Sequence, residues 1–247
     1  MAEELITLHR RSTGRDPETF GITLWANTLI RSQGALEAQA LALMGVEPVW
    51  NARGDVVDVA LITPLGRPRV DVVLTITGMY RDSFADKALL LDRAVQLAAE
   101  ATEEPGQPNH VRSHTEALAR ELSGRGMEAE EARRLARARI FGAEPGKYGA
   151  GLGRVPASDG WTNRGQLAGD YLDRMGFAFT AESWARPAPE LFRSQLRNVE
   201  AVVHGRSSNL YGVMDITENY EYQGGMALAV EQFGGTAPAM YLNDLVG

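Results

Sequence analysis

The run RVDVVLTITG, residues 69–78, constrains the fold of this chain more than any other stretch. Its β-branched and apolar residues are typical of a central strand that is buried on both faces of a parallel sheet. The strand is predicted to stop at Gly78, and a helix with a regular apolar stripe follows over 79–101, with Asp82 or Ser83 available as its N-cap. A strand that leads directly into a helix indicates an α/β fold.

Further strands and helices are predicted before this unit. They are a short strand over 21–26, a helix over 33–45 that ends at Gly45, and two strands within 47–64. Because strands and helices alternate, we predict a Rossmann-like, doubly wound parallel sheet in residues 1–104. An acidic segment rich in proline and glycine follows and marks the boundary.

The remainder, residues 105–247, is predicted to be a mainly helical part. The predicted helices cover residues 110–124, 128–140, 163–175 and 189–203. A long glycine-rich loop occupies 141–161, and a loop of this kind is more often functional than passive. A late strand over 236–244 is available to return to the sheet.

Two adjacent glycines, Gly224 and Gly225, stand at the start of a predicted helix whose apolar face runs from Met226 to Phe233. A glycine in a helix interior costs about 1 kcal/mol relative to alanine. Another element or a ligand is therefore expected to approach the backbone closely at this pair.

Charge and composition exclude several classes of protein. A formal net charge of −7 argues against nucleic-acid binding, which needs a basic face to neutralise phosphates. The chain has no cysteine, which excludes disulfides and thiolate metal sites and favours a cytoplasmic location. With no signal-peptide pattern and no apolar run of about 18 residues, the chain is predicted to be soluble and without a membrane span.

The turn after the 69–78 strand is a place where open α/β sheets bind ligands. Arg81 and Asp82 are candidates to project into that crevice. In the alternative interpretation Gly78 makes the turn, Asp82 caps the helix and Arg81 pairs with it. The glycine-rich loop lacks the G-x-x-x-x-G-K-[ST] pattern, so a nucleotide phosphate site is rejected.

Histidines and acids offer metal or proton-transfer chemistry. His110 and His114 have the spacing that places two imidazoles on one helix face for a metal, but no catalytic glutamate adjoins them, and solvated helix histidines are favoured. His204 is predicted to end a helix, where the dipole alone would stabilise it. With it, Asp215, Glu218 and Glu221 could bind a cation, or the acids could be charges at a helix start, since Asp215 and Glu218 have capping-box spacing.

Polar and aromatic residues surround these groups in the sequence. The loop after His204 carries Arg206, Ser207 and Asn209, which are candidates for ligand contacts. Tyr220 could stack on a flat ligand, whereas packing in the core is the competing interpretation for a tyrosine.

Five blocks of the sequence occur in the order and spacing of a known family. They are QALALMGVEPVWN, GRPRVDVVLTITGMYRDSF, RIFGAEPGKYGAGL, SSNLYGVMDITENYEYQGGMALAV and PAMYLND. The chain resembles the large subunit of aerobic cobaltochelatase, and it is also similar to the porphyrin-binding H subunit of magnesium chelatase. The resemblance extends from about Phe20 to the end of the chain.

This resemblance implies a large subunit that binds a tetrapyrrole and is the place where Co2+ or Mg2+ is inserted, while separate ATPase-motor subunits supply energy. A role in cobalamin biosynthesis follows from the cobaltochelatase likeness. Tetrapyrrole carboxylates or amides are expected at Arg81 and Arg206, with stacking by Tyr148 or Tyr220. A base must accept the pyrrole protons, and His204, Glu218 and Glu221 are the candidates, although no family motif assigns them that role.

The family's upstream HGTHG…E motif has no counterpart here, so the chain is predicted to be a piece or a split form of the large subunit. It would supply one wall of the tetrapyrrole cavity or serve as scaffold, and it is expected to be inactive alone. The rival hypotheses are a non-catalytic binding or subunit-docking module and a stand-alone α/β enzyme acting on another small molecule.

Overall fold

The computed structural model describes residues 1–103, 106–152, 163–210, 212, 215 and 217–246, with the backbone alone at residue 218. Seven strands form one sheet in the order β7-β6-β5-β4-β1-β8-β9, and two strands form a separate sheet. The strands are β1 (Thr19–Leu24), β2 (Val46–Trp50), β3 (Val56–Leu61), β4 (Asp71–Ile76), β5 (Ile140–Gly142), β6 (Phe177–Ala178), β7 (Arg186–Pro187), β8 (Ala201–Arg206) and β9 (Ala239–Asp244).

The central part of the large sheet is parallel. β1 pairs in parallel with β4 on one side and with β8 on the other, and β5 and β9 continue the parallel arrangement outward. Only β6 and β7, at one edge, run antiparallel. The prediction of an α/β chain with a mostly parallel central sheet is confirmed, and all residues of β4 are buried, as expected of the apolar run at 69–78.

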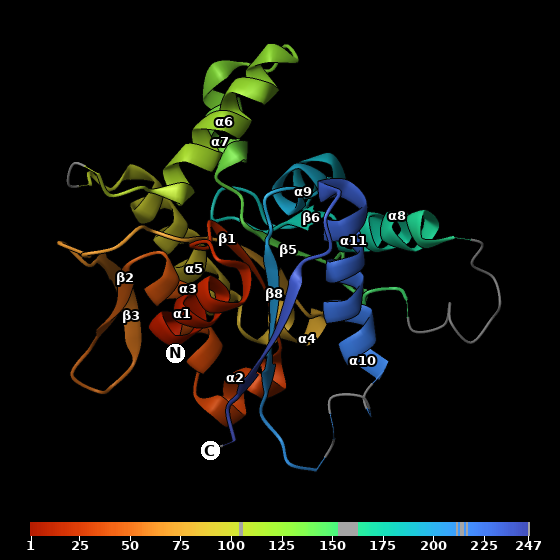
Figure 1. The fold of residues 1–247 in the computed structure, drawn as a ribbon, viewed down its shortest axis with the longest axis horizontal. Coiled ribbons are helices and arrows are strands. Elements are labelled where there is room, and N and C mark those ends of the chain that lie inside the picture. The colour runs from red at the N-terminus through yellow and green to blue at the C-terminus, as the bar shows by residue number, and fades with distance from the viewer. Residues whose placement is uncertain (104–105, 153–162, 211, 213–214, 216, 247) are drawn as a thin grey trace.

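Helices cover both faces of this sheet (Figure 1). They are α1 (Ala2–Thr13), α2 (Ala26–Ser32), α3 (Ala35–Leu43), α4 (Gly78–Ser83), α5 (Ala85–Glu100), α6 (His110–Gly124), α7 (Ala129–Ala136), α8 (Arg164–Met175), α9 (Pro189–Leu196), α10 (Thr217–Asn219) and α11 (Gly225–Gly234), with a π-helix, η2 (Tyr220–Gly224), between the last two. Alternate residues of β4 serve the two layers: Val72 belongs to a core cluster that includes residues of α1, α3 and α5, while Val73 belongs to one that includes residues of α8, α9 and α11.

The structure differs in three details near the N-terminus and the central strand. Residues 2–13, for which no element was predicted, form helix α1, and Gly14 caps its C-terminus with a left-handed φ of 75°. The strands predicted within 47–64 exist, but β2 and β3 pair only with each other, antiparallel. Neither Asp82 nor Ser83 caps a helix: α4 begins after Thr77, whose hydroxyl accepts the N–H of Tyr80, and α5 begins after a break in the helix.

The helix predicted over 189–203 is also wrong. Helix α9 stops at Leu196, and the β-branched residues Val202 and Val203 belong to strand β8, as does His204. These residues are buried between the two helical layers, where a central parallel strand fits better than a further helical turn. His204 therefore does not lie at a helix C-terminus, and a helix dipole does not act on it there.

Strands on both sides of residue 104 share the same seven-stranded sheet. The late strand predicted over 236–244 is β9, which lies beside β8 at the edge of that sheet. The division into parts 1–104 and 105–247 stays a prediction. Of the predicted glycine-rich loop at 141–161, residues 153–161 lie outside the described residues.

The adjacent glycines that open α11 have different surroundings. A Cβ added to Gly225 would lie 2.5 Å from Cδ2 of Tyr171 and 2.9 Å from Cδ1 of Leu152, whereas nothing lies within 4 Å of the same position on Gly224. The close approach expected from the sequence is thus made by the ring of Tyr171 on α8. Helix α11 packs against α8 through Gly225.

We expect Gly225→Ala to lower the free energy of unfolding by about 1–3 kcal/mol, because a methyl group there overpacks the α8–α11 contact. Gly224→Ala is the matched control, and it should be neutral or stabilise by up to about 1 kcal/mol, the gain in helix propensity. Urea unfolding followed by far-ultraviolet circular dichroism measures both. Equal effects of the two substitutions would contradict the assigned contact.

Candidate functional site

The carboxyl ends of β1, β4 and β8 meet at one edge of the sheet because the three strands are parallel. From β1 the chain builds the sheet in one direction through β4 and β5, and from β8 it builds in the other direction through β9. In open α/β sheets, ligands bind where the direction reverses, outside the carboxyl ends of the strands. We call the region at the ends of β1 and β8 the crevice.

Trp25 follows β1 directly and lies at the centre of the crevice. Its ring contacts those of His204 and Tyr222 edge-on, with centroid distances of 5.6 and 5.4 Å. These three residues come from β1, β8 and η2, segments that are far apart in the sequence. Sequence analysis missed Trp25, because its place after a short strand is informative only once β8 is known to lie beside that strand.

His204 is a neutral residue of this aromatic group. It is 5% exposed, and burial lowers its pKa to about 4. Among the described residues, neither His204 Nδ1 nor Trp25 Nε1 has a hydrogen-bond partner, although both atoms are buried. Two unpartnered polar atoms on rings in contact are unusual, because burying such groups without a partner is costly.

Arg81 holds the segment that follows β5. The residue is 3% exposed, and its Nη1 donates to the carbonyl oxygens of Ala143, Glu144 and Lys147 at 2.9, 2.8 and 3.2 Å. Its Nε and Nη2 donate to the two carboxylate oxygens of Asp82 at 2.6 and 2.8 Å. The pairing of Arg81 with Asp82 that the sequence allowed is therefore present, and the guanidinium orders residues 143–147.

Tyr148 extends this cluster towards solvent. Its hydroxyl donates to Oδ2 of Asp82 at 2.7 Å, and its ring is 61% exposed. The hydrogen bond from Arg81 holds the pKa of Asp82 below its usual value, and the hydrogen bond to Asp82 raises the pKa of Tyr148. Arg81, Asp82 and Tyr148, which the sequence nominated separately, thus form one cluster.

The polar loop after β8 lies on the other side of the crevice. Ser207 Oγ is 3.3 Å from Thr28 Oγ1 on α2. This hydrogen bond between hydroxyls joins the loop after β8 to the helix that follows β1. Arg206 donates from Nη2 to Oδ2 of Asp244 at 2.9 Å and keeps 31% of its side chain exposed. Asn209 is exposed.

The segment before α11 adds aromatic and acidic groups. Tyr222 is 4% exposed, and burial raises its pKa to about 12. Glu221 accepts the N–H of Ala150 at 3.1 Å and so links η2 to the glycine-rich segment. Tyr220 is 49% exposed, and Glu218 lies in α10 with its side chain outside the described part of the structure.

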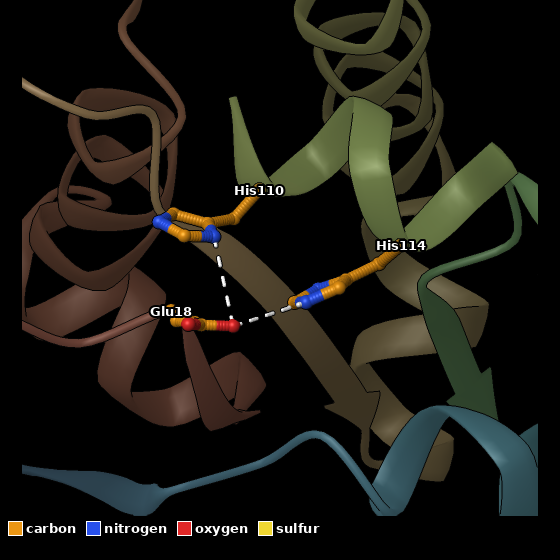
Figure 2. A group of neighbouring side chains, drawn as sticks. All are labelled: Glu18, His110 and His114. Carbon is orange, nitrogen blue, oxygen red and sulfur yellow. Dashed lines mark ion pairs between the residues drawn. The ribbon is translucent and has the colours of Figure 1, made fainter. Parts of the chain in front are cut away.

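His110 and His114 lie away from the crevice, at the amino end of the sheet (Figure 2). Their side chains are only 16% and 14% exposed, so the expectation of solvated helix histidines is wrong. Both rings face Glu18, which directly precedes β1. Among the described residues, this trio is the one group of histidines and acids close enough to hold a metal ion.

Comparison with known proteins gives a consistent result. The family described as CobN/Magnesium Chelatase matches residues 1–246. The aerobic cobaltochelatase subunit CobN of Sinorhizobium sp is 39% identical over 246 residues, which are 98% of this chain and 19% of that protein. The magnesium-chelatase H subunit of Cereibacter sphaeroides is 31% identical over 245 residues, which are 98% of this chain and 20% of that protein.

A solved structure is also similar over almost the whole chain. It is the catalytic subunit of cobaltochelatase from Mycobacterium tuberculosis, with a TM-score of 0.91 and 35% identity over 99% of this chain and 20% of that one. The chain therefore spans about a fifth of the length of these proteins. No helix among the described residues is long and apolar enough to cross a membrane.

Proposed function

The chain belongs to the CobN/magnesium chelatase family, and from this membership we propose that it forms part of the tetrapyrrole-binding large subunit of a metal chelatase. In this proposal the crevice is one wall of the tetrapyrrole cavity, and the remainder of the large protein supplies the rest. The length of the relatives, about five times that of this chain, supports a partial cavity here.

The observation that carries the proposal is the pair of unpartnered atoms, His204 Nδ1 and Trp25 Nε1, at the ends of β1 and β8. The ends of these strands are where the doubly wound, Rossmann-like arrangement that we propose for the sheet would bind its ligand. The strand order around β1 supports that arrangement. A flat apolar ring with hydrogen-bonding groups at its rim would satisfy both orphaned atoms once the groups that cover them move aside.

The residues around the crevice suit the side chains and the face of a tetrapyrrole. Arg206, Ser207 and Asn209 are our candidates to meet carboxylates or amides, and the exposed residues Tyr148 and Tyr220 are our candidates for stacking. Arg81 and Asp82 act on the same ligand by holding Tyr148 and the backbone of residues 143–147.

Metal insertion displaces the protons of the pyrrole N–H groups, so a proton acceptor is required. Glu221, Glu218 and His204 are our candidates. Glu221 already lies against the glycine-rich segment, and His204 is neutral at pH 7, with a pKa of about 4 that makes it a weak base. Glu221 is also partly exposed, whereas His204 is buried, so a ligand reaches Glu221 more readily and we favour it of these two.

We further propose that Co2+ rather than Mg2+ is inserted, in cobalamin biosynthesis, since the similarity is greater to CobN of Sinorhizobium sp than to the magnesium-chelatase H subunit of Cereibacter sphaeroides. ATP would be hydrolysed by separate motor subunits in the cytoplasm. The absence of a G-x-x-x-x-G-K-[ST] pattern from the sequence supports this division of labour.

The test is a titration of the purified chain with a cobalt-free corrinoid precursor and, separately, with a protoporphyrin, followed by ligand absorbance and fluorescence. We expect saturable binding of the corrinoid, weakened at least about tenfold, or 1.4 kcal/mol, by His204→Ala and by Arg206→Ala. Arg133→Ala, which removes an exposed arginine on α7, is the matched control and should leave binding unchanged.

Binding of the protoporphyrin alone would replace cobalt by magnesium in this proposal. Binding that survives both crevice substitutions would move the cavity elsewhere on the chain. No binding of either ligand at high micromolar concentration would leave the chain as scaffold or subunit-docking module.

A further inference from the structure

A second polar cluster lies at the opposite edge of the sheet from the crevice. Glu18 precedes β1, and His110 and His114 lie at the start of α6 and point towards it (Figure 2). One ligand atom from each of the three residues lies within 4.8 Å of the other two. Strand β1 separates the two edges, and a strand of six residues spans about 20 Å.

The two distances from Glu18 to the histidines are close to those between the ligands of a metal site. His114 Nε2 and His110 Nδ1 lie 3.5 and 3.7 Å from the same oxygen, Oε2 of Glu18. In a tetrahedral site with metal–ligand bonds of about 2.0–2.1 Å, the ligand atoms stand about 3.3–3.4 Å apart. These two pairs would have to close by only a few tenths of an ångström.

A buried carboxylate orients His114. Nδ1 of His114 is 3.0 Å from Oδ2 of Asp71, whose side chain is 1% exposed. The same carboxylate accepts hydrogen bonds from Nε and Nη2 of Arg139 at 2.9 and 3.0 Å. The carboxylate accepts the Nδ1–H of His114 and leaves the lone pair of Nε2 directed at Glu18, as in carboxylate–histidine–zinc triads.

A salt bridge accounts less well for the arrangement. Nδ1 of His110 and Nε2 of His114 lie 3.7 and 3.5 Å from one oxygen of Glu18, which is longer than an N–H···O hydrogen bond of about 2.7–3.2 Å. The carboxylates of Glu18, Asp71 and Glu200 all act electrostatically on His110, and their negative charge favours a bound cation. The side chain of Glu18 is 55% exposed, which gives an ion a path from solvent.

We propose that Glu18, His110 and His114 bind one borderline divalent cation of the Zn2+ or Co2+ type, with water in the remaining position. Two imidazoles and one carboxylate are a donor set that such ions prefer to the oxygen-only sets of Mg2+ and Ca2+. The site is separate from the crevice and does not rest on the function proposed there.

The test is titration of the 247-residue chain with Zn2+ alone by calorimetry and with Co2+ alone by visible absorption. We expect one ion per chain and an affinity that Glu18→Gln and His110→Ala each reduce at least about tenfold. Glu116→Gln, which makes the same charge change at an exposed position of α6, is the matched control and should bind as the unaltered chain does.

Thermal melting of each variant without metal checks that the fold is kept, and Zn2+ should raise the melting temperature of the unaltered chain but not of His110→Ala. The proposal is overturned by the absence of binding at submillimolar metal, or by binding that neither Glu18→Gln nor His110→Ala weakens. Tetrapyrrole plays no part in this experiment, so its outcome is independent of the crevice titration.

Discussion

Arg139→Met is expected to destabilise the fold by about 3–5 kcal/mol, because it leaves a buried carboxylate without its cation. The side chains of Arg139 and Asp71 are 0% and 1% exposed. Nε of Arg139 donates to Oδ1 of Asp71 at 2.9 Å and Nη2 donates to Oδ2 at 3.0 Å, so the pair is bidentate. The guanidinium also donates to the carbonyl oxygen of Ala136 at 2.7 Å and joins the end of α7 to the start of β4.

Chemical unfolding of the chain measures this loss. Arg133→Met is the control: its ion pair with Glu130 is exposed, and such pairs contribute about 0–1 kcal/mol. Adding Asp71→Asn to Arg139→Met should recover part of the loss, since it removes the uncompensated charge. If Arg139→Met lowered the free energy of unfolding no more than Arg133→Met does, the buried ion pair would not stabilise the fold as its geometry indicates.

The second large effect is a loss of stability in mild acid that depends on His204. Its pKa is about 4 in the folded chain, below the value near 6.5 of an exposed histidine. The unfolded state therefore binds the proton more readily, so the contribution of His204 is fully present above pH 6.5 and is lost as the pH falls towards 4. At about 1.4 kcal/mol per unit of pKa difference, the loss is about 3 kcal/mol.

His204→Leu removes this titration while keeping an apolar side chain in the aromatic group. Above pH 6.5 the difference in unfolding free energy between the two chains should stay constant. As the pH falls towards 4, this difference should change by about 3 kcal/mol in favour of the variant, because only the unaltered chain loses the contribution of His204. Burial also lowers the pKa values of His9 and His110, but both histidines are present in the two chains and cancel in the difference. Parallel curves throughout would show that His204 is solvated or paired in solution.

Much of the central sheet could be predicted from local pattern. The β-branched run of β4 and the turn at Gly78 follow from the residues themselves, and α5 follows from its apolar stripe. Strand β8 could not be predicted in the same way, because Phe192, Leu196, Val199 and Val203 keep a helical spacing with no proline or glycine between them. Only its burial between β1 and β9 decides that this segment is a strand.

The sites were less accessible to sequence analysis, because their residues are brought together over long separations. Glu18 and His110 are separated by 91 residues in the sequence. The sequence pattern therefore could not predict that Glu18 supplies the acidic group beside the two histidines. Arg81 was nominated to project into the crevice or to pair with Asp82, and besides that pairing it donates to backbone carbonyls, which no side-chain pattern predicts. The cluster of Arg81, Asp82 and Tyr148 shows that nominated residues can meet without each of them facing a ligand.

The π-helix η2 sets the direction in which the residues before α11 point around the helix axis, and these residues lie beside the crevice. Each residue of an α-helix advances by about 100°, and a π-turn accommodates one residue more than an α-turn. Removing one residue from η2 would thus rotate the residues before it by about 100° relative to α11, and Tyr220 and Glu221 would leave their present directions. The length of η2, rather than any one of its side chains, sets the angle at which this wall faces β8.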